Sequence, residues 1–286
     1  MMDWRKIAMT AFLIFSGIIR TSAAEPQESV VSAKLKWSLK QTFKVPESVL
    51  YDSLRNVIYV SNINGSPGAA DGNGFIAKVS PEGKLLTLRW ISGLNAPKGM
   101  AIYRDALWVA DLNAIVQIDI IRGEIVRKFD LKARFLNDLT VDDQGSVYCS
   151  DNVDDRIYCL RNGRPTIWID GGLDAPNGLL AEANRLVMLS SATGYVNFID
   201  YQKKTIRKSA HIDGSPDGIV AVRNGYLLSD FRGTVYHLAA NGKLTKIVDT
   251  KAQNISAADI GYIPGKKLLL VPTFSNNSLD AYEISD

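Results

Sequence analysis

The stretch Pro216-Asp217-Gly218-Ile219 is one of six versions of a short phrase that returns through the 286-residue chain. The other five versions are Pro46-Glu47-Ser48-Val49, Pro97-Lys98-Gly99-Met100, Leu136-Asn137-Asp138-Leu139, Pro176-Asn177-Gly178-Leu179 and Ala258-Asp259-Ile260-Gly261. Their second residues lie 51, 39, 40, 40 and 42 positions apart, and a glycine-rich insertion at 64–74 lengthens the first interval. A period of about forty residues is typical of propellers and other repeat folds.

A short apolar run follows each phrase and ends in a small or acidic residue, as in Leu107-Trp108-Val109-Ala110-Asp111. These runs are rich in β-branched and aromatic residues and are bounded by turn residues, so they predict buried strands. A third strand follows in each unit, and a more polar fourth strand closes most units. The sequence therefore predicts an all-β, six-bladed β-propeller with four antiparallel strands per blade.

The two ends of the chain complement each other. The last unit ends before its fourth strand, whereas residues 33–45 form a spare strand ahead of the first unit. We expect the N-terminal strand to complete the last blade, because this closes the ring and removes two exposed sheet edges. Residues 25–286 are thus predicted to form a single propeller domain.

Residues 1–24 are predicted to be a cleaved signal peptide. Arg5 and Lys6 form a basic start, 7–19 is a mainly apolar run, and Ser22-Ala23-Ala24 supplies the small residues of a cleavage site. The apolar run is short for a membrane span, although an uncleaved anchor is the alternative interpretation. We expect an exported protein, periplasmic or secreted.

The charge balance argues against nucleic acid as a partner. The formal net charge is +3, and it falls to +1 when Arg5, Lys6, Arg20 and Asp3 leave with the signal peptide. A chain so close to neutral has no basic field for nucleic acid. We expect a small-molecule substrate, no membrane association after cleavage, and a monomer, since a closed propeller needs no partner for stability.

The two cysteines leave two interpretations open. Cys149 and Cys159 flank a predicted hairpin turn on neighbouring strands. Export would permit a disulfide, whereas two buried thiols in a sheet are the alternative. One residue of strand register decides whether the sulfur atoms meet.

The second residues of the six phrases are the candidate site. The innermost strand of each propeller blade lines the central channel, so these residues should recur at one height near one mouth. They are Glu47, Lys98, Asn137, Asn177, Asp217 and Asp259. Carboxylate and amide oxygens suit a hard divalent cation, so we expect calcium, with manganese, magnesium or zinc as other candidates. The alternative is that Asn and Asp only make the turn into each strand.

These motifs resemble the gluconolactonase, senescence marker protein and luciferin-regenerating enzyme family of six-bladed propellers. The resemblance runs from Pro46 to the end of the chain. Glu47 matches the family's metal-binding glutamate, Asn177-Gly178-Leu179 its metal-binding asparagine, and Pro216-Asp217-Gly218 its metal-binding aspartate. Arg134-Phe135-Leu136-Asn137-Asp138 resembles the phrase that carries a substrate-binding asparagine.

The resemblance implies a metal-dependent hydrolase of a sugar lactone or a similar small cyclic ester. Glu47, Asn177 and Asp217 would hold the metal, which polarises the carbonyl and binds the attacking water. Asp217 would also be the catalytic base. The residues expected beside the substrate are Asn137, Arg134, Lys98 and Asp259.

Two other functions stay open. A propeller can keep such a ring and use it only to bind a small ligand or a partner protein. A lyase would need a histidine at the channel mouth, for which His211 is the candidate. A serine hydrolase is not indicated, because no Gly-x-Ser-x-Gly phrase is present.

Overall fold

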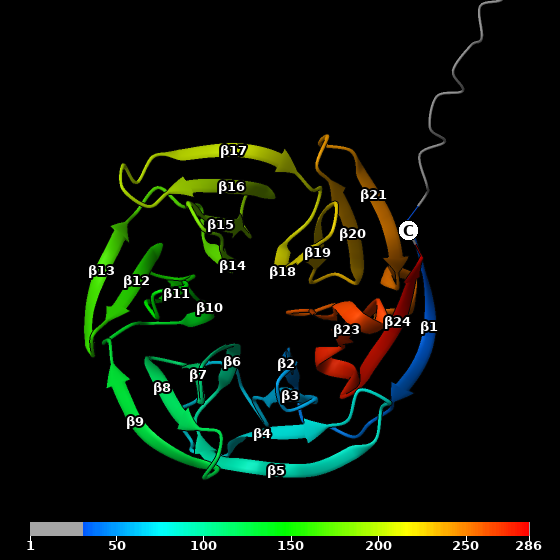
Figure 1. Ribbon diagram of the computed structural model, residues 1–286, viewed down its shortest axis with the longest axis horizontal. Coiled ribbons are helices and arrows are strands. Elements are labelled where there is room, and N and C mark those ends of the chain that lie inside the picture. The colour runs from blue at the N-terminus through cyan, green and yellow to red at the C-terminus, as the bar shows by residue number, and fades with distance from the viewer. Residues whose placement is uncertain (1–30, 286) are drawn as a thin grey trace, which may run out of the picture. The chain divides into compact units, whose positions relative to one another are not determined.

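The computed structural model describes residues 31–285 and confirms the predicted propeller. Six four-stranded sheets stand as blades around a central axis (Figure 1). Blades 1 to 5 are β2–β5, β6–β9, β10–β13, β14–β17 and β18–β21, and blade 6 combines β22, β23, β24 and β1. The predicted signal peptide and its cleavage site lie outside the described residues.

The strands have the following bounds, from the axis outward. The innermost strands are β2 (Pro46–Asp52), β6 (Pro97–Tyr103), β10 (Leu136–Val141), β14 (Pro176–Ala181), β18 (Pro216–Val222) and β22 (Gly261–Ile263). The second strands are β3 (Val57–Asn62), β7 (Ala106–Asp111), β11 (Val147–Asp151), β15 (Arg185–Ser190), β19 (Gly225–Asp230) and β23 (Leu268–Pro272). The third strands are β4 (Gly74–Val79), β8 (Ala114–Asp119), β12 (Arg156–Arg161), β16 (Tyr195–Asp200), β20 (Thr234–Ala239) and β24 (Leu279–Ser285).

The outermost strands are β5 (Leu85–Leu94), β9 (Glu124–Asp130), β13 (Arg164–Asp170), β17 (Ile206–His211), β21 (Leu244–Asp249) and β1 (Ser32–Leu39). Short 3-10 turns lie at η1 (Lys251–Gln253), η2 (Pro264–Lys266) and η3 (Phe274–Asn276). Within residues 31–285, no helix has the length and apolar character needed to cross a membrane.

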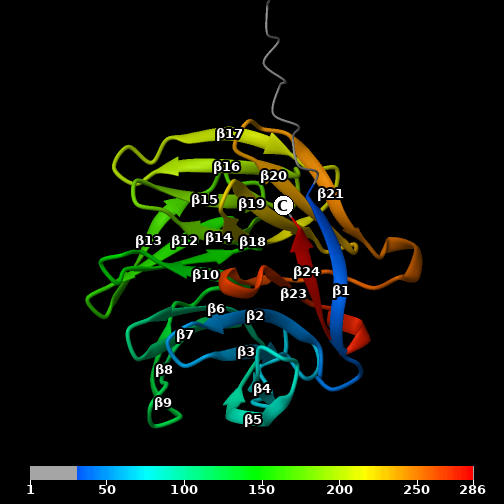
Figure 2. The ribbon, with the colours of Figure 1, turned by 45° about the vertical axis from the view of Figure 1, so that its right-hand side comes forward.

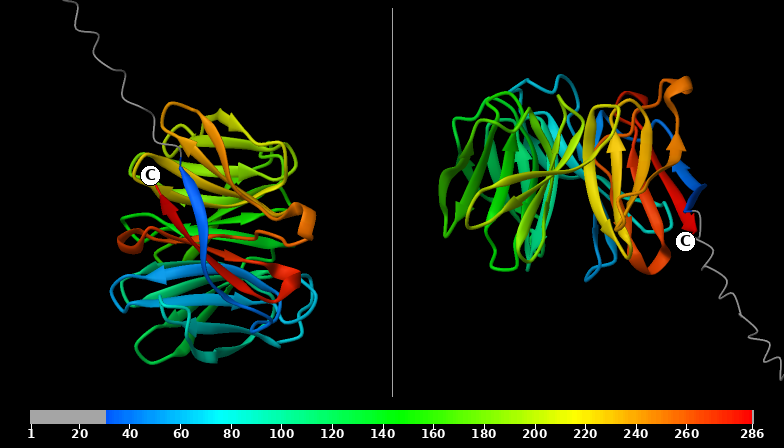
Figure 3. Two further views of the ribbon diagram at one scale, coloured as in Figure 1. Left: turned by 90° about the vertical axis from the view of Figure 1, so that its right-hand side faces the viewer. Right: turned by 90° about the horizontal axis from the view of Figure 1, so that it is seen from above.

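The N-terminal strand closes the ring, as predicted. β1 pairs antiparallel with β24, from Ser32 opposite Ser285 to Leu39 opposite Leu279, and the two strands run side by side in Figures 2 and 3. Blade 6 therefore contains both ends of the described chain. This arrangement leaves no blade with a missing fourth strand.

The core lies between neighbouring blades. Val60 and Phe75 of blade 1 pack in one buried cluster with Leu270 and Ala281 of blade 6. Each sheet thus buries a face against the next sheet, at about 1.5–3 kcal/mol for each large apolar side chain. This packing therefore fixes the position of each inner strand along the central axis.

Side chains of the second strands hold the repeated phrases in place. In blade 5, the Asp230 carboxylate accepts a hydrogen bond from the Ser215 backbone N–H (3.0 Å), just before the phrase. The register between Pro216 and Ile219 is irregular, and the Gly218 N–H in this bulge donates to Ser229 Oγ (2.8 Å). A bulge of this kind aims side chains away from the regular strand direction.

The register of blade 3 decides the state of the cysteines. Cys149 lies opposite Tyr158, and Cys159 lies opposite Tyr148. The two thiols are therefore on opposite faces of the sheet, and each packs in a different core cluster. Both are buried and free. The disulfide interpretation is wrong, and the interpretation as two buried thiols is confirmed.

Candidate active site at one mouth of the channel

Four second residues of the phrases form a buried group at one mouth of the channel, which we call the mouth cluster: Glu47, Lys98, Asn177 and Asp217. They are only 5%, 2%, 7% and 5% exposed, respectively. Each sits near the start of an inner strand of a different blade. Burial of three ionisable side chains in one place is costly unless they compensate one another.

One direct contact within the mouth cluster joins blades 4 and 5. Asn177 Nδ2 donates a hydrogen bond to Asp217 Oδ1 (2.7 Å). The amide nitrogen faces the carboxylate, so the Asn177 carbonyl oxygen is left as an acceptor. These two residues present several oxygen atoms close together.

Asp259 lies at a different height from the one expected. It bridges to Ser48, the third residue of the first phrase, and Ser48 Oγ donates to Asp259 Oδ2 (2.5 Å). The backbone fixes this offset, because the Asp259 N–H donates to the Glu47 carbonyl oxygen (2.9 Å). Asp259 therefore belongs to the layer of third residues, one step below the mouth cluster.

Asp138 is a second buried carboxylate in this lower layer, and the sequence analysis missed its role. Its oxygen atoms accept hydrogen bonds from the backbone N–H groups of Leu139 (2.7 Å) and Leu179 (2.6 Å). Gly99 of blade 2 makes room for it, since a Cβ there would overlap Asp138 Oδ1. The available signal was an acidic third residue where four of the other five phrases have Ser or Gly.

The buried carboxylates raise one another's pKa. Burial raises the pKa of Glu47 well above its usual range, and repulsion from Asp217 and Asp259 raises it further, against the effect of Lys98. Burial and the charge of Asp259 raise the pKa of Asp217 to about 7. Burial also raises the pKa of Asp259 to about 7 and that of Asp138 well above its usual range.

The positive charge in the cluster does not balance these four carboxylates. Burial lowers the pKa of Lys98, although Glu47 favours its charged form. The Lys98 ammonium donates to the Ala96 carbonyl oxygen (3.2 Å) and lies 4.3 Å from the centroid of the Phe135 ring. Because the site has four carboxylates and one ammonium, we expect it to bind protons or a further cation.

Glu47 provides the sharpest indication of a missing partner. Its Oε2 atom is buried and has no hydrogen-bond partner. Carboxylate and amide oxygens are the donors that hard divalent cations prefer, so this set fits such an ion. Across residues 31–285, no three His, Cys, Asp or Glu side chains could hold a metal by themselves. A bound ion would therefore also need the Asn177 amide oxygen.

The remaining predicted site residues lie outside this buried group. Asn137 is half-buried on β10. The Arg134 side chain is 69% exposed, and its guanidinium lies 3.5 Å from Asp154, so it is not brought into the mouth cluster. His211 sits on the outermost strand β17 and stacks against Tyr195 (centroids 4.9 Å apart). It is not at the channel mouth, which removes the candidate for the lyase interpretation.

The central channel below the cluster is a cavity of about 360 Å³. Ser48, Asp138 and Asp259 form its polar end, and side chains such as Leu179 and Ile219 line its walls. The residues of the mouth cluster do not line this cavity. The lower carboxylates therefore separate the channel from the mouth cluster.

A sequence scan finds no matching protein family, and a search of curated proteins finds no match. The structure is similar to a gluconolactonase from Xanthomonas campestris, at 16% identity over 89% of this chain and 95% of that chain, with a TM-score of 0.67. It is also similar to a catalytically inactive virginiamycin B lyase from Staphylococcus aureus with quinupristin (14%, covering 88% and 99%, TM-score 0.61).

A chain of the nidogen/laminin complex is similar as well, at 19% identity over 76% of this chain and 84% of that chain, with a TM-score of 0.65. These three structures belong to a hydrolase, a lyase and a protein–protein complex. Identities this low show the fold alone. The comparisons therefore support a six-bladed β-propeller and leave the activity to be argued from the site.

Proposed function

We propose that this protein is a metal-dependent hydrolase of a sugar lactone or a similar small cyclic ester, acting at the mouth cluster. The observation that carries the proposal is the unpartnered, buried Glu47 Oε2 within an excess of carboxylates. The likeness in fold to a gluconolactonase is consistent with this reaction.

Glu47, Asn177 and Asp217 would hold the divalent cation, for which calcium is our first choice, with manganese, magnesium or zinc as other candidates. When bound, such an ion supplies polarisation of the ester carbonyl and lowers the pKa of a water. Asp217 would also accept a proton from this water, since a carboxylate that holds the ion is within reach of the water.

Other residues of the chain would bind and orient the substrate. The Lys98 ammonium is the buried cation of the mouth cluster and can donate hydrogen bonds to substrate oxygens. Asn137 is half-buried at the start of β10 and can donate to, or accept from, ring hydroxyls. Burial of these groups strengthens such contacts relative to water.

The test is a thermal-melting titration of the protein with calcium, manganese, magnesium and zinc, followed by a lactone hydrolysis assay. A cation at 100 times its Kd should stabilise the fold by about 2.7 kcal/mol. Glu47→Gln should abolish this shift, and Asp217→Asn should lower kcat about 10²- to 10⁴-fold. Asp143→Asn, a change at an exposed carboxylate, is the matched control.

A non-catalytic propeller is the second candidate, and Lys98 is the observation that favours it. This ammonium already supplies positive charge inside the mouth cluster, so the cluster can persist without a metal. The ring would then bind a small ligand or a partner protein. No melting shift with any of the four metals, together with no hydrolysis above the spontaneous rate, would establish this candidate over the first.

A further inference from the structure

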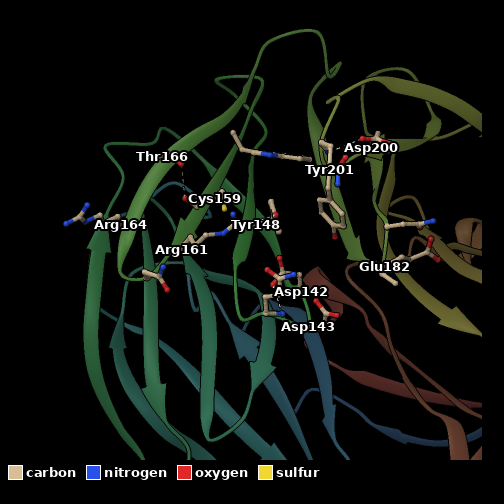
Figure 4. Close-up of a pocket in the computed structure, with 16 residues that line it drawn as sticks. Asp142, Asp143, Tyr148, Cys159, Arg161, Arg164, Thr166, Glu182, Asp200 and Tyr201 are labelled. Carbon is tan, nitrogen blue, oxygen red and sulfur yellow. Dashed lines mark hydrogen bonds between the residues drawn. The ribbon is translucent and has the colours of Figure 1, made fainter.

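A larger cavity, of about 1070 Å³, opens between blades 3 and 4 (Figure 4). It is bordered by the turns that join first to second strands and third to fourth strands, around Asp142, Asn162, Glu182 and Gln202. The mouth cluster lies at the opposite ends of the inner strands and contributes no side chain to this cavity. The proposed hydrolase reaction leaves the cavity without a role.

Three aromatic rings form one wall of the cavity. The centroid of Tyr148 lies 5.0 Å from that of Trp168 and 5.4 Å from that of Tyr201, and the last two are 6.0 Å apart. Trp168 and Tyr201 are half-buried, so part of each borders the open space. The Tyr201 hydroxyl is buried and has no hydrogen-bond partner. These three rings give the cavity an aromatic wall that can hold a cation.

The same aromatic position in blade 1 is covered by a cation of the chain. Lys78 lies opposite Tyr59 in the sheet. Its ammonium sits 3.9 Å from the centroid of Trp90 and 5.7 Å from that of Tyr59. In blade 2, the Arg127 guanidinium lies 4.4 Å from the centroid of Phe129. The Tyr59–Trp90 pair and the Phe129 ring thus have a cation–π partner within the chain.

In the described part of blade 3, the cation lies farther from the rings than it does in blade 1. The residue opposite Tyr148, in the register position of Lys78, is Cys159, which brings no charge. The Lys204 ammonium lies 6.0 Å from the centroid of the Trp168 ring. It also donates a hydrogen bond to the Trp168 carbonyl oxygen (2.8 Å). Among residues 31–285, no cation is seated over the Tyr148 or Tyr201 ring.

The charges around the cavity favour a positive ligand. Its border carries Asp142, Asp143, Glu182 and Asp200 against Arg161 and Arg164. Figure 4 shows Asp142 and Asp143 on the side of the cavity below Tyr201. Burial raises the pKa of Tyr201, and the carboxylates of Asp142, Glu182 and Asp143 contribute to the rise. Glu182 is already paired with Arg185 (2.5 Å), so the three aspartates supply the negative charge beside the aromatic wall.

We propose that this cavity is a second ligand site, which binds a small organic cation of the alkylated ammonium class. The ammonium would sit against Trp168 and Tyr201, in the place that Lys78 fills in blade 1. The carboxylates would balance its charge, as in aromatic cages that recognise quaternary ammonium groups. The volume is sufficient for a ligand considerably larger than the ammonium group.

The test is calorimetric titration of the full chain with choline and with its neutral isostere, 3,3-dimethylbutan-1-ol. We expect choline to bind at least about tenfold more tightly, because only the charged ammonium gains the cation–π contact and the attraction of the carboxylates. Equal binding of the two compounds, or no binding of choline, overturns the proposal.

Variants separate this site from folding defects and from the mouth cluster. Cys159→Lys recreates the arrangement of blade 1 and should abolish choline binding, whereas Cys159→Ser should retain it. Asp143→Asn, at an exposed position that tolerates a polar change, should weaken binding severalfold. Asp217→Asn should leave choline binding unchanged. Retention of wild-type affinity in both Cys159→Lys and Asp143→Asn would overturn the proposal.

Discussion

Ser48 and Asp259 lie 211 residues apart in sequence and are joined by a hydrogen bond of 2.5 Å from Ser48 Oγ to Asp259 Oδ2. The Asp259 backbone N–H adds a second bond, to the Glu47 carbonyl oxygen (2.9 Å). These contacts join blade 6 to blade 1 near the axis of the ring. The pairing of β1 with β24 joins the two ends of the described chain at the periphery. The contact between the first and last blades therefore includes two of the buried acidic residues, Glu47 and Asp259.

The first prediction concerns pH. Asp217 and Asp259 have pKa values raised to about 7, above the usual value of 3.8. Below about pH 4 these carboxyls are protonated in both the folded and the unfolded chain, so they contribute no pH dependence. Between about pH 4 and 7 the folded chain holds more protons, so their contribution to stability falls as pH rises, and above 7 the full cost remains.

Asp259→Asn removes one of these carboxyls. The free energy of unfolding of this variant, measured with urea in the presence of a chelator, should therefore increase relative to wild type as pH rises from about 4 to about 8. Asp143→Asn provides the control, since an exposed carboxylate should give no such trend. If the free energies of unfolding of wild type and Asp259→Asn changed with pH in the same way, the pKa of Asp259 would not be raised by folding.

The second prediction concerns Lys98, whose ammonium lowers the pKa of Glu47. Lys98→Met leaves the carboxylates without their buried cation, so we expect a loss of about 3–5 kcal/mol near pH 8 and less near pH 5, where the carboxyls are protonated. Added divalent cation should recover part of the loss if the mouth cluster binds one. Lys203→Met, at an exposed lysine, is the control. An equal loss at both pH values would mean that only packing was removed.

The fold could be predicted from the sequence because each repeat has its own local sequence pattern. Each phrase and each apolar run predicts one strand. The six phrases, most of them 39 to 42 residues apart, predict six blades. The unpaired strand at residues 33–45 predicted the closure by β1 for the same reason. The sequence also predicted that Glu47, Asn177 and Asp217 would converge on one mouth, and they are buried near the starts of inner strands of blades 1, 4 and 5.

The details that the sequence analysis missed depend on contacts between blades. The height of Asp259 follows from its bridge to Ser48. The available signal was the apolar fourth residue of the other phrases, since Ile260 directly follows Asp259 just as Leu139 follows Asp138. Asp138 is held by the N–H of Leu179 in the next blade. Arg134 faces Asp154 because of the path of its loop. Such contacts join residues far apart in the sequence, which a reading of single segments does not capture.

The third prediction concerns the cysteines. Cys149 and Cys159 lie on opposite faces of their hairpin, and burial raises the pKa of both thiols. We expect neither to react with a thiol reagent in the native protein, since the thiolate is the reactive form. Protein purified without reductant should show two reactive thiols after unfolding. No reactive thiol after unfolding would mean that the cysteines pair and that the register of β11 and β12 differs.

The last prediction tests the fit between blades 2 and 3. A Cβ on Gly99 would overlap Asp138 Oδ1, whereas a Cβ on Gly265 would meet no atom within 4 Å. Gly99→Ala should therefore cost about 1–3 kcal/mol of folding free energy, and Gly265→Ala should change it little. Asp138→Ala removes the overlapping carboxylate but leaves the backbone atoms Asp138 Cα (2.6 Å) and Leu139 N (2.9 Å), so the cost of Gly99→Ala should shrink only in part in that background. A double-mutant cycle of urea unfolding measures this coupling, and additive effects would mean that the backbone contacts alone set the cost of Gly99→Ala.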